Sequence, residues 1–228
     1  IYMKKYIYIL ILFFFTTQAQ THTSHYEGIK VINMEIFKGG KKIGYSNFFF
    51  EHKKNKVEVK NYTQFEVKLF GVVVFSISSE AHEKYKDGKL IYFKSITFQN
   101  DKEKYVNLKY NKLKNKFVIN GSSFKGEINT DAIIGNWWNH KILKSSKQIS
   151  PLSGSVKEQV VTFIGNENIE LYGKSYLVEH YKLKSKNQDL PKDKKLNFDI
   201  WLDKKNNLIL KIMYSRMGEW EYRLKSTE

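Results

Sequence analysis

Hydrophobic and polar residues alternate with a period of two along most of this chain. The clearest example is residues 57–69, where one parity is mainly apolar and the other is polar or charged. The apolar parity holds Val57, Val59, Phe65, Val67 and Leu69, with Asn61 and Thr63 between them, and the polar parity holds Glu58, Lys60, Gln64, Glu66 and Lys68. Because successive side chains of a strand point to opposite faces, this pattern predicts antiparallel strands with one buried and one solvated face.

Turn residues such as Gly39-Gly40, Asp87-Gly88 and the run DKKNN at 203–207 separate the alternating segments, which predicts a meander of hairpins. We expect strands near 29–38, 43–52, 56–69, 72–85, 89–99, 104–111, 116–120, 156–164, 169–184, 196–203, 207–216 and 218–226. Long strands in a meander twist and curl. The predicted fold is therefore mainly β, a long-stranded antiparallel meander curled into a closed or half-open barrel.

One segment departs from the alternation, DAIIGNWWNHKIL at residues 131–143. Asp131 can cap a helix, and Ile134, Trp137, Trp138 and then Lys141 or Ile142 follow at steps of three or four residues. That spacing predicts one short amphipathic helix near 131–143. A curled sheet has an open mouth, and a short helix with two tryptophans would cover it.

Two interpretations of this segment stay open. It is a lid that closes the core, or it is a lid that also gates a ligand pocket. In the second case Trp137 and Trp138 form part of the pocket, and Asn139 and His140 lie at its rim. Neighbouring residues of a helix point about 100° apart, so one ring would face inward. The pattern does not decide which one.

The beginning of the chain predicts export. Met3-Lys4-Lys5 precedes the apolar run YIYILILFFF at 6–15, and TTQA follows with Thr17 and Ala19 at small-residue positions. This order is typical of a cleavable signal peptide over residues 1–19. A polar leader then occupies 20–25, and a single antiparallel β domain is expected over 26–228, soluble in the periplasm.

Composition restricts the chemistry. The chain has no cysteine, which excludes a thiol nucleophile and thiolate metal ligands. Its formal net charge is +16, but Arg216 and Arg223 are its only arginines. Arginine is the residue that forks onto phosphate and guanine, so nucleic-acid binding is not expected. Weak association with anionic membrane surfaces is the better expectation. The oligomeric state is left open.

Candidate acid–base groups are few. Glu80 and His82 share a strand face in SEAHEKY, but no second cluster with the spacing of a zinc site appears. Neither a nucleophile elbow nor a phosphate-binding loop is present, so we expect no catalytic residue, metal or cofactor. Asp199 and Trp201 lie on one strand face together with Asp203, whose position in DKKNN fits a turn cap.

The arrangement of several segments resembles an uncharacterised family of exported bacterial proteins, the domain of unknown function numbered 6134. The matching segments are IFKGGKKIGYSNF at 36–48, KYKDGKLIYFKSITFQND at 84–101, WWN at 137–139, and FDIWLDKKNNLILKIMYS at 198–215 followed by EWEYR. The family's proline-serine or proline-threonine before the triplet is replaced by Gly135-Asn136. The resemblance implies an antiparallel β domain in the periplasm and no assigned activity.

These observations favour a non-enzymatic, barrel-like periplasmic domain that binds an apolar or amphiphilic ligand, a lipid or a protein partner. Its predicted ligand-binding residues are Trp137, Trp138, Asn139, His140, Asp199 and Trp201. The alternative is a periplasmic enzyme that uses Glu80, His82 and Asp199 as acid/base groups. An enzyme requires these three groups to converge in one cleft, whereas a binding protein requires only a largely apolar cavity.

Overall fold

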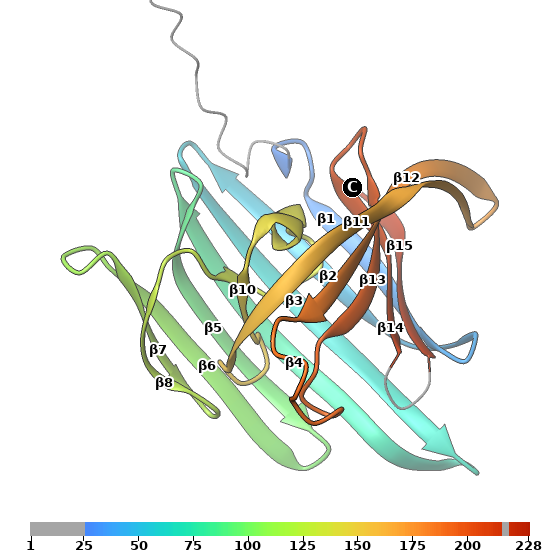
Figure 1. The fold of residues 1–228 in the computed structure, drawn as a ribbon, viewed down its shortest axis with the longest axis horizontal. Coiled ribbons are helices and arrows are strands. Elements are labelled where there is room, and N and C mark those ends of the chain that lie inside the picture. The colour runs from blue at the N-terminus through green and yellow to red at the C-terminus, as the bar shows by residue number, and fades with distance from the viewer. Residues whose placement is uncertain (1–25, 216–218) are drawn as a thin grey trace, which may run out of the picture.

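The computed structural model describes residues 26–215 and 219–228 (Figure 1). The predicted signal peptide over 1–19 and the leader over 20–25 lie outside the described residues. Strands make up 69% of the described residues. The prediction of a mainly β protein is confirmed.

Within the described residues, fifteen strands form one continuous sheet. They are β1 (Val31–Lys38), β2 (Lys41–Lys53), β3 (Lys56–Leu69), β4 (Val72–Lys86), β5 (Lys89–Gln99), β6 (Lys102–Asn111), β7 (Lys116–Gly121), β8 (Lys125–Asn129), β9 (Ile133–Ile134), β10 (Lys147–Ile149), β11 (Val156–Leu171), β12 (Lys174–Ser185), β13 (Asn197–Asp203), β14 (Leu208–Ser215) and β15 (Glu219–Thr227). Successive strands are mostly joined by tight turns, as a meander requires.

The strand order is β8-β7-β6-β5-β4-β3-β2-β1-β15-β14-β13-β12-β11-β10-β9. The first and last described strands, β1 and β15, pair with each other. In this pair Ile32 lies opposite Thr227, and Lys38 lies opposite Trp220. Of the described pairs, only β9 with β10 is parallel. Strands β8 and β9 lie at the two ends of this order and do not pair with each other. The curled sheet is therefore not closed by hydrogen bonds.

The predicted boundary between the strands at 156–164 and 169–184 is wrong, because the turn lies further along the chain than predicted. β11 continues to Leu171, and the turn to β12 is formed by Tyr172 and Gly173 with φ angles of 51° and 75°. Two positive φ angles are the mark of a tight two-residue hairpin turn. A tyrosine at its first position gives no turn signal in the sequence, because Asn and Asp are the residues usually found there.

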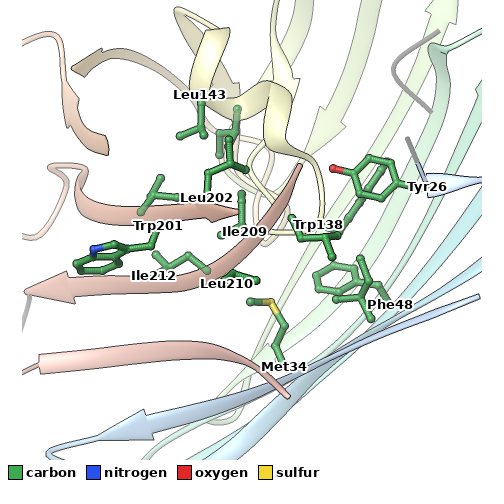
Figure 2. Packing of buried hydrophobic residues seen from close by; sticks show 14 of the residues in the cluster. Tyr26, Met34, Phe48, Trp138, Leu143, Trp201, Leu202, Ile209, Leu210 and Ile212 are labelled. Atoms are coloured by element: carbon green, nitrogen blue, oxygen red, sulfur yellow. The ribbon is translucent and has the colours of Figure 1, made fainter. Parts of the chain in front are cut away.

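The largest hydrophobic cluster lies between the inner face of the sheet and the segment that precedes β10. Trp138 lies at the centre of this cluster and is only 1% exposed. Figure 2 shows its indole beside Tyr26 and above Phe48. Leucine and isoleucine side chains of β13 and β14, including Leu202 and Ile209, pack in the same cluster. Strands on both sides of the β1–β15 pair therefore share one core across the curl.

The helix predicted near 131–143 is wrong in kind and extent. The segment is extended, with Ala132, Ile134, Asn136 and Trp138 buried at alternate positions, and only His140–Lys144 form a short 3-10 helix, η2. Backbone partners from a distant segment explain the difference. β9 pairs with β10, and the Gly135 N–H donates to the Ile149 carbonyl at 2.9 Å. A helix would have made these bonds internally.

Packing and loop contacts cover the gap that β8 and β9 leave. The Ser123 N–H donates to the Ser153 carbonyl at 2.9 Å, and the Ser95 hydroxyl donates to the Pro151 carbonyl at 2.5 Å. Gly121 is required at this contact, since a Cβ there would lie 2.6 Å from the Ser153 carbonyl oxygen. The loop at 150–155 thus joins the β7–β8 side of the sheet to the start of β11.

Candidate ligand-binding site

Four neighbouring strands, β2 to β5, carry polar side chains in the middle of the inner face. We call these residues, Ser46, Asn61, Thr63, Ser79 and Thr97, the polar band. The hydroxyls of Ser46 and Thr63 lie 2.7 Å apart, as do those of Ser79 and Thr97. Asn61 donates to the Ser46 Oγ at 3.1 Å and accepts from the Thr63 hydroxyl at 3.1 Å. The band satisfies its own hydrogen bonds, which offsets the cost of burying it.

A buried carboxyl group, that of Glu83 on β4, adjoins this band. Glu83 is 1% exposed. The Tyr85 hydroxyl donates to its Oε2 at 2.6 Å, and the Asn136 amide and the Trp138 indole N–H donate to its Oε1 at 2.6 and 3.0 Å. Burial raises the pKa of Glu83 to about 7, against the opposite pull of these three hydrogen bonds. Near neutral pH the site therefore holds both the acid and the carboxylate form.

Asn136 also contributes an unsatisfied acceptor. Its side chain is 7% exposed, and its Oδ1 has no hydrogen-bond partner among the described residues. Most buried polar atoms in proteins do have a partner. The Asn136 Oδ1 is itself almost inaccessible to solvent, so it represents an uncompensated cost of burial next to the cavity.

All polar-band residues except Thr97, together with Glu83 and Asn136, border a cavity of about 300 Å³ between the sheet and the extended segment. Its other walls are aromatic and aliphatic, and two lysines complete the lining. The residues around it are Ser46, Phe48, Asn61, Thr63, Phe65, Ile77, Ser79, Ala81, Glu83, Phe93, Gly135, Asn136, Trp137, Gln148, Ser150, Pro151, Leu152, Lys157, Lys195, Leu196, Phe198, Tyr214 and Tyr222. The cavity lining thus combines hydrogen-bonding side chains with aromatic and aliphatic ones.

The two tryptophans occupy different environments. Trp138 makes edge-to-face contacts with Tyr26 and Phe50, at ring-centroid distances of 5.1 and 5.3 Å, and it does not line the cavity. Trp137 does line it, and its ring centroid lies 5.0 Å from that of Phe198 on β13. An extended backbone sends neighbouring side chains in opposite directions. One tryptophan therefore belongs to the core and the other to the cavity wall.

Asn139 and His140 have structural contacts. The Asn139 Oδ1 accepts the Lys141 N–H at 3.1 Å and caps η2. The His140 Nδ1 lies 2.7 Å from the Tyr26 hydroxyl. Burial raises the pKa of this hydroxyl above its usual range. Asn139 borders a second hollow of about 480 Å³, together with Lys141 and Lys144. Neither Asn139 nor His140 reaches the cavity beside Glu83.

Asp199 and Trp201 lie in a network away from the cavity. The His180 Nε2 is 3.0 Å from the Asp199 Oδ1, and the Lys182 ammonium is 2.5 Å from its Oδ2. Trp201 stacks on the His180 ring at 4.6 Å and donates its indole N–H to Glu167. Of the six predicted ligand-binding residues, the structure places only Trp137 in the wall of the cavity.

The three groups proposed for an enzyme do not converge. Glu80 is exposed on β4, and the His82 Nε2 on the same face lies 2.8 Å from the Glu58 carboxylate. Asp199 is on β13, and five strands stand between β4 and β13 in the sheet order. None of the three lines either of the two cavities described above.

Within residues 26–215 and 219–228, no group of three or more histidine, aspartate or glutamate side chains has the geometry to hold a metal ion. No helix in the same ranges has the length and apolar character needed to cross a bilayer.

Comparison with known proteins agrees with this architecture. The family model of a domain of unknown function, DUF6134, matches residues 34–225. The chain belongs to the DUF6134 family. No curated protein matches this DUF6134 chain. Among solved structures it is similar to a β-barrel-like protein of domain of unknown function DUF1849 from Brucella abortus. That similarity has a TM-score of 0.57 at 10% identity and covers 87% of this chain and 95% of the other. At such low identity it shows a β-barrel-like fold alone.

In this DUF6134 chain, Glu83 stands beside Glu80 and His82 in SEAHEKY but was not selected as a site residue, although a signal for it was present. Glu83 shares the parity of Ile77, Ser79 and Tyr85, which are all buried, whereas Glu80 and His82 lie on the opposite parity. The two residues selected for chemistry were therefore those on the solvated face. Likewise, the polar interruption at Asn61 and Thr63 on an otherwise apolar parity marks the polar band.

Proposed function

We propose that this protein is an exported, periplasmic binding domain without catalytic activity, and that it holds an apolar or amphiphilic small molecule in the cavity beside Glu83. The observation that carries the proposal is the mixed lining of the cavity. Aromatic rings such as Phe65, Trp137 and Phe198 line it together with Glu83 and polar-band residues such as Thr63. Ligand sites typically combine an apolar lining with a few placed polar groups.

The size of the cavity favours a small ligand. At about 300 Å³ it lies at the lower end of the range for small-molecule pockets. It corresponds to roughly ten water molecules at about 30 Å³ each. This space suits one chain or one ring system of an amphiphile rather than a complete two-chain lipid.

The polar groups suggest how a ligand would be oriented. A hydroxyl or amide on the ligand would donate to the carboxyl of Glu83. Lys157 and Lys195 also border the cavity and would attract an anionic head group. Both ends of an amphiphile therefore find chemically suitable side chains.

Native mass spectrometry of protein purified gently from the periplasm tests the proposal, and we expect a co-purifying small molecule. Titration with dodecanol and dodecanoic acid should then change the fluorescence of Trp137. Ala81→Phe, which fills the cavity, should abolish the change, and Ser78→Phe, on the exposed face of the same strand, should leave it intact. Absence of binding by the parent protein, or equal binding by both variants, would refute the proposal.

Export is tested separately. The order Met3-Lys4-Lys5, apolar run, Thr17 and Ala19 motivates a mature chain that begins near Gln20. Amino-terminal sequencing of protein from the periplasmic fraction should find that start. Recovery of the unprocessed chain from the cytoplasm would overturn this part of the proposal.

A further inference from the structure

One hairpin extends past both of its neighbours in the sheet. β2 pairs with β3 only as far as Phe65, and β5 pairs with β4 only from Ile77, with a further backbone bond from Asn100 to Ser76. Residues 67–75, which we call the projecting hairpin, are therefore paired only with each other, as in Leu69 opposite Val72. It forms the end of the long cyan hairpin at the lower right of Figure 1.

The tip of the projecting hairpin is apolar and exposed. The exposed fractions are 57% for Leu69, 97% for Phe70, 66% for Val72, 45% for Val73 and 51% for Val74. Single exposed apolar residues are ordinary, but an unbroken apolar run at a tip marks an interaction site or an aggregation risk. In residues 69–74 only Gly71 interrupts the run.

Neither the turn nor the packing accounts for an aromatic residue at the tip. Phe70 and Gly71 have φ angles of 49° and 82°, the backbone of a turn that favours Asn-Gly and disfavours bulky side chains. Tyr172 occupies the equivalent turn position between β11 and β12, but its hydroxyl donates to Glu35 at 2.6 Å and Lys225 lies over its ring. Among the described residues, the Phe70 ring has no such contact, and it is almost fully exposed.

We propose that Leu69–Val74, the tip of the projecting hairpin, inserts into the interfacial region of a lipid bilayer that contains anionic lipids. This inference goes beyond the proposed ligand binding and does not depend on it. Apolar side chains on a projecting tip supply the anchor, as they do for other proteins that lie at the membrane surface. The bilayer accepts a narrow wedge without needing a complementary groove.

Charge complementarity favours an anionic surface. The formal net charge is +16 for the whole chain and +14 without Lys4 and Lys5 of the predicted signal peptide, and this positive charge attracts anionic lipid head groups at long range. In the neighbouring β1–β2 hairpin, β1 ends at Lys38 and β2 begins at Lys41. Because Gly44 of β2 lies opposite Phe65 of β3, this hairpin turn is at the same end of the sheet as Phe70. The acidic group on the hairpin stem, Glu66, is 3.6 Å from the Lys68 ammonium.

The exposed area favours a bilayer over a folded protein partner. The five apolar side chains at the tip offer an exposed area on the order of 500 Å². A standard protein–protein interface buries about 800 Å² on each partner. A second copy of this chain docked on the tip alone would therefore be a weak complex, whereas partition into a bilayer requires no minimum matching surface.

Flotation with vesicles of phosphatidylglycerol and phosphatidylethanolamine, compared with vesicles of phosphatidylcholine, tests the proposal. We expect the parent protein to float with the anionic vesicles, and Phe70→Asn to weaken binding about tenfold, because one aromatic anchor is lost. Phe70→Asn should keep or raise the melting temperature, because asparagine tolerates a positive φ. Loss of binding could then not be attributed to misfolding.

Leu113→Asn is the matched control. Leu113 is 99% exposed in the turn between β6 and β7, at the opposite end of the sheet, and its replacement should leave vesicle binding unchanged. Failure of the parent protein to float, or equal flotation of the parent and Phe70→Asn, would overturn the proposal. Equal weakening by both variants would also overturn it, and equal binding to phosphatidylcholine would overturn the anionic requirement. Dodecanol binding in the cavity is a separate readout, which Phe70→Asn should not alter.

Discussion

The inner face of the sheet differs between the surroundings of Trp138 and those of Trp137, although the two residues are adjacent in the chain. Around Trp138, aromatic and aliphatic side chains from strands on both sides of the β1–β15 pair fill the space. Beside Trp137, most of the polar band and Phe198 line a cavity of about 300 Å³. The comparison teaches that one extended segment can complete a core with one side chain and border a cavity with the next.

Glu83 stands at the boundary between these two regions. It accepts the indole N–H of Trp138 and also lines the cavity. Burial and the hydrogen bonds from the core determine how much the charge of Glu83 costs in stability. A ligand in the cavity would contact the same side chain. Changes to Trp138, Glu83 and Trp137 should therefore separate stability from binding.

The largest effect is expected from Trp138→Ala. Removal of a fully buried indole leaves a void and should lower the free energy of unfolding by about 3–5 kcal/mol. Chemical denaturation measures the change. Trp138→Phe retains most of the volume but loses the N–H to Glu83, and it should cost less. If Trp138→Ala unfolds like the parent protein, the core around Tyr26 and Phe50 is not as described.

The next effect is a pH dependence that originates at Glu83. Its pKa in the folded state is about 7, above its ordinary value of 4.5, so the folded state binds the proton more tightly than the unfolded state. Stability should be highest below about pH 4.5 as far as this group is concerned and should fall as the pH rises to 7. The loss between pH 5 and pH 8 should be about 2–3 kcal/mol.

Glu83→Gln should remove most of this pH dependence. The neutral amide can still accept from Asn136 and Trp138 and can donate to the Tyr85 hydroxyl. Urea denaturation at pH 5 and pH 8 should show nearly equal stability for the variant, and higher stability than the parent protein at pH 8. An unchanged slope in the variant would show that another group is responsible.

A smaller effect on stability is expected from Trp137→Ala. The ring is only partly buried, so the free energy of unfolding should fall by about 1–2 kcal/mol. Binding of dodecanol should weaken by about tenfold, because the ring forms part of the cavity wall. The comparison between the two tryptophans fails if Trp137→Ala costs more stability than Trp138→Ala, or if only Trp138→Ala changes binding.

The smallest effect should come from His82→Ala on the outer face. His82 is paired with Glu58, whose carboxylate also lies 3.4 Å from the Lys84 ammonium. Partly exposed ion pairs contribute about 1 kcal/mol or less, so stability should change by no more than that, and dodecanol binding should be unchanged. A large loss of binding in this variant would place the ligand on the outer face instead.

Much of the fold was predictable because its main signal is local. The alternation in residues 57–69 identifies β3 and its buried parity without reference to any other strand. The candidate site was less predictable, since Glu83 becomes unusual only when burial and three donors from other segments surround it. Asp199 and Trp201 were expected at the ligand site, but they lie in the His180 network.

The sequence by itself determined twelve of the fifteen described strands, most of the turns between them and the buried parity of strands such as β3, but it did not reveal β8, β9 or β10. Only the tertiary structure decided the conformation of residues 131–143 and the position of the cavity. The spacing of Ile134, Trp137 and Trp138 fits a helical stripe, but Ile134 and Trp138 also fit the alternation of an extended segment. Pairing of β9 with the distant β10 selects the extended form, because it satisfies backbone groups that a helix would otherwise have paired within itself.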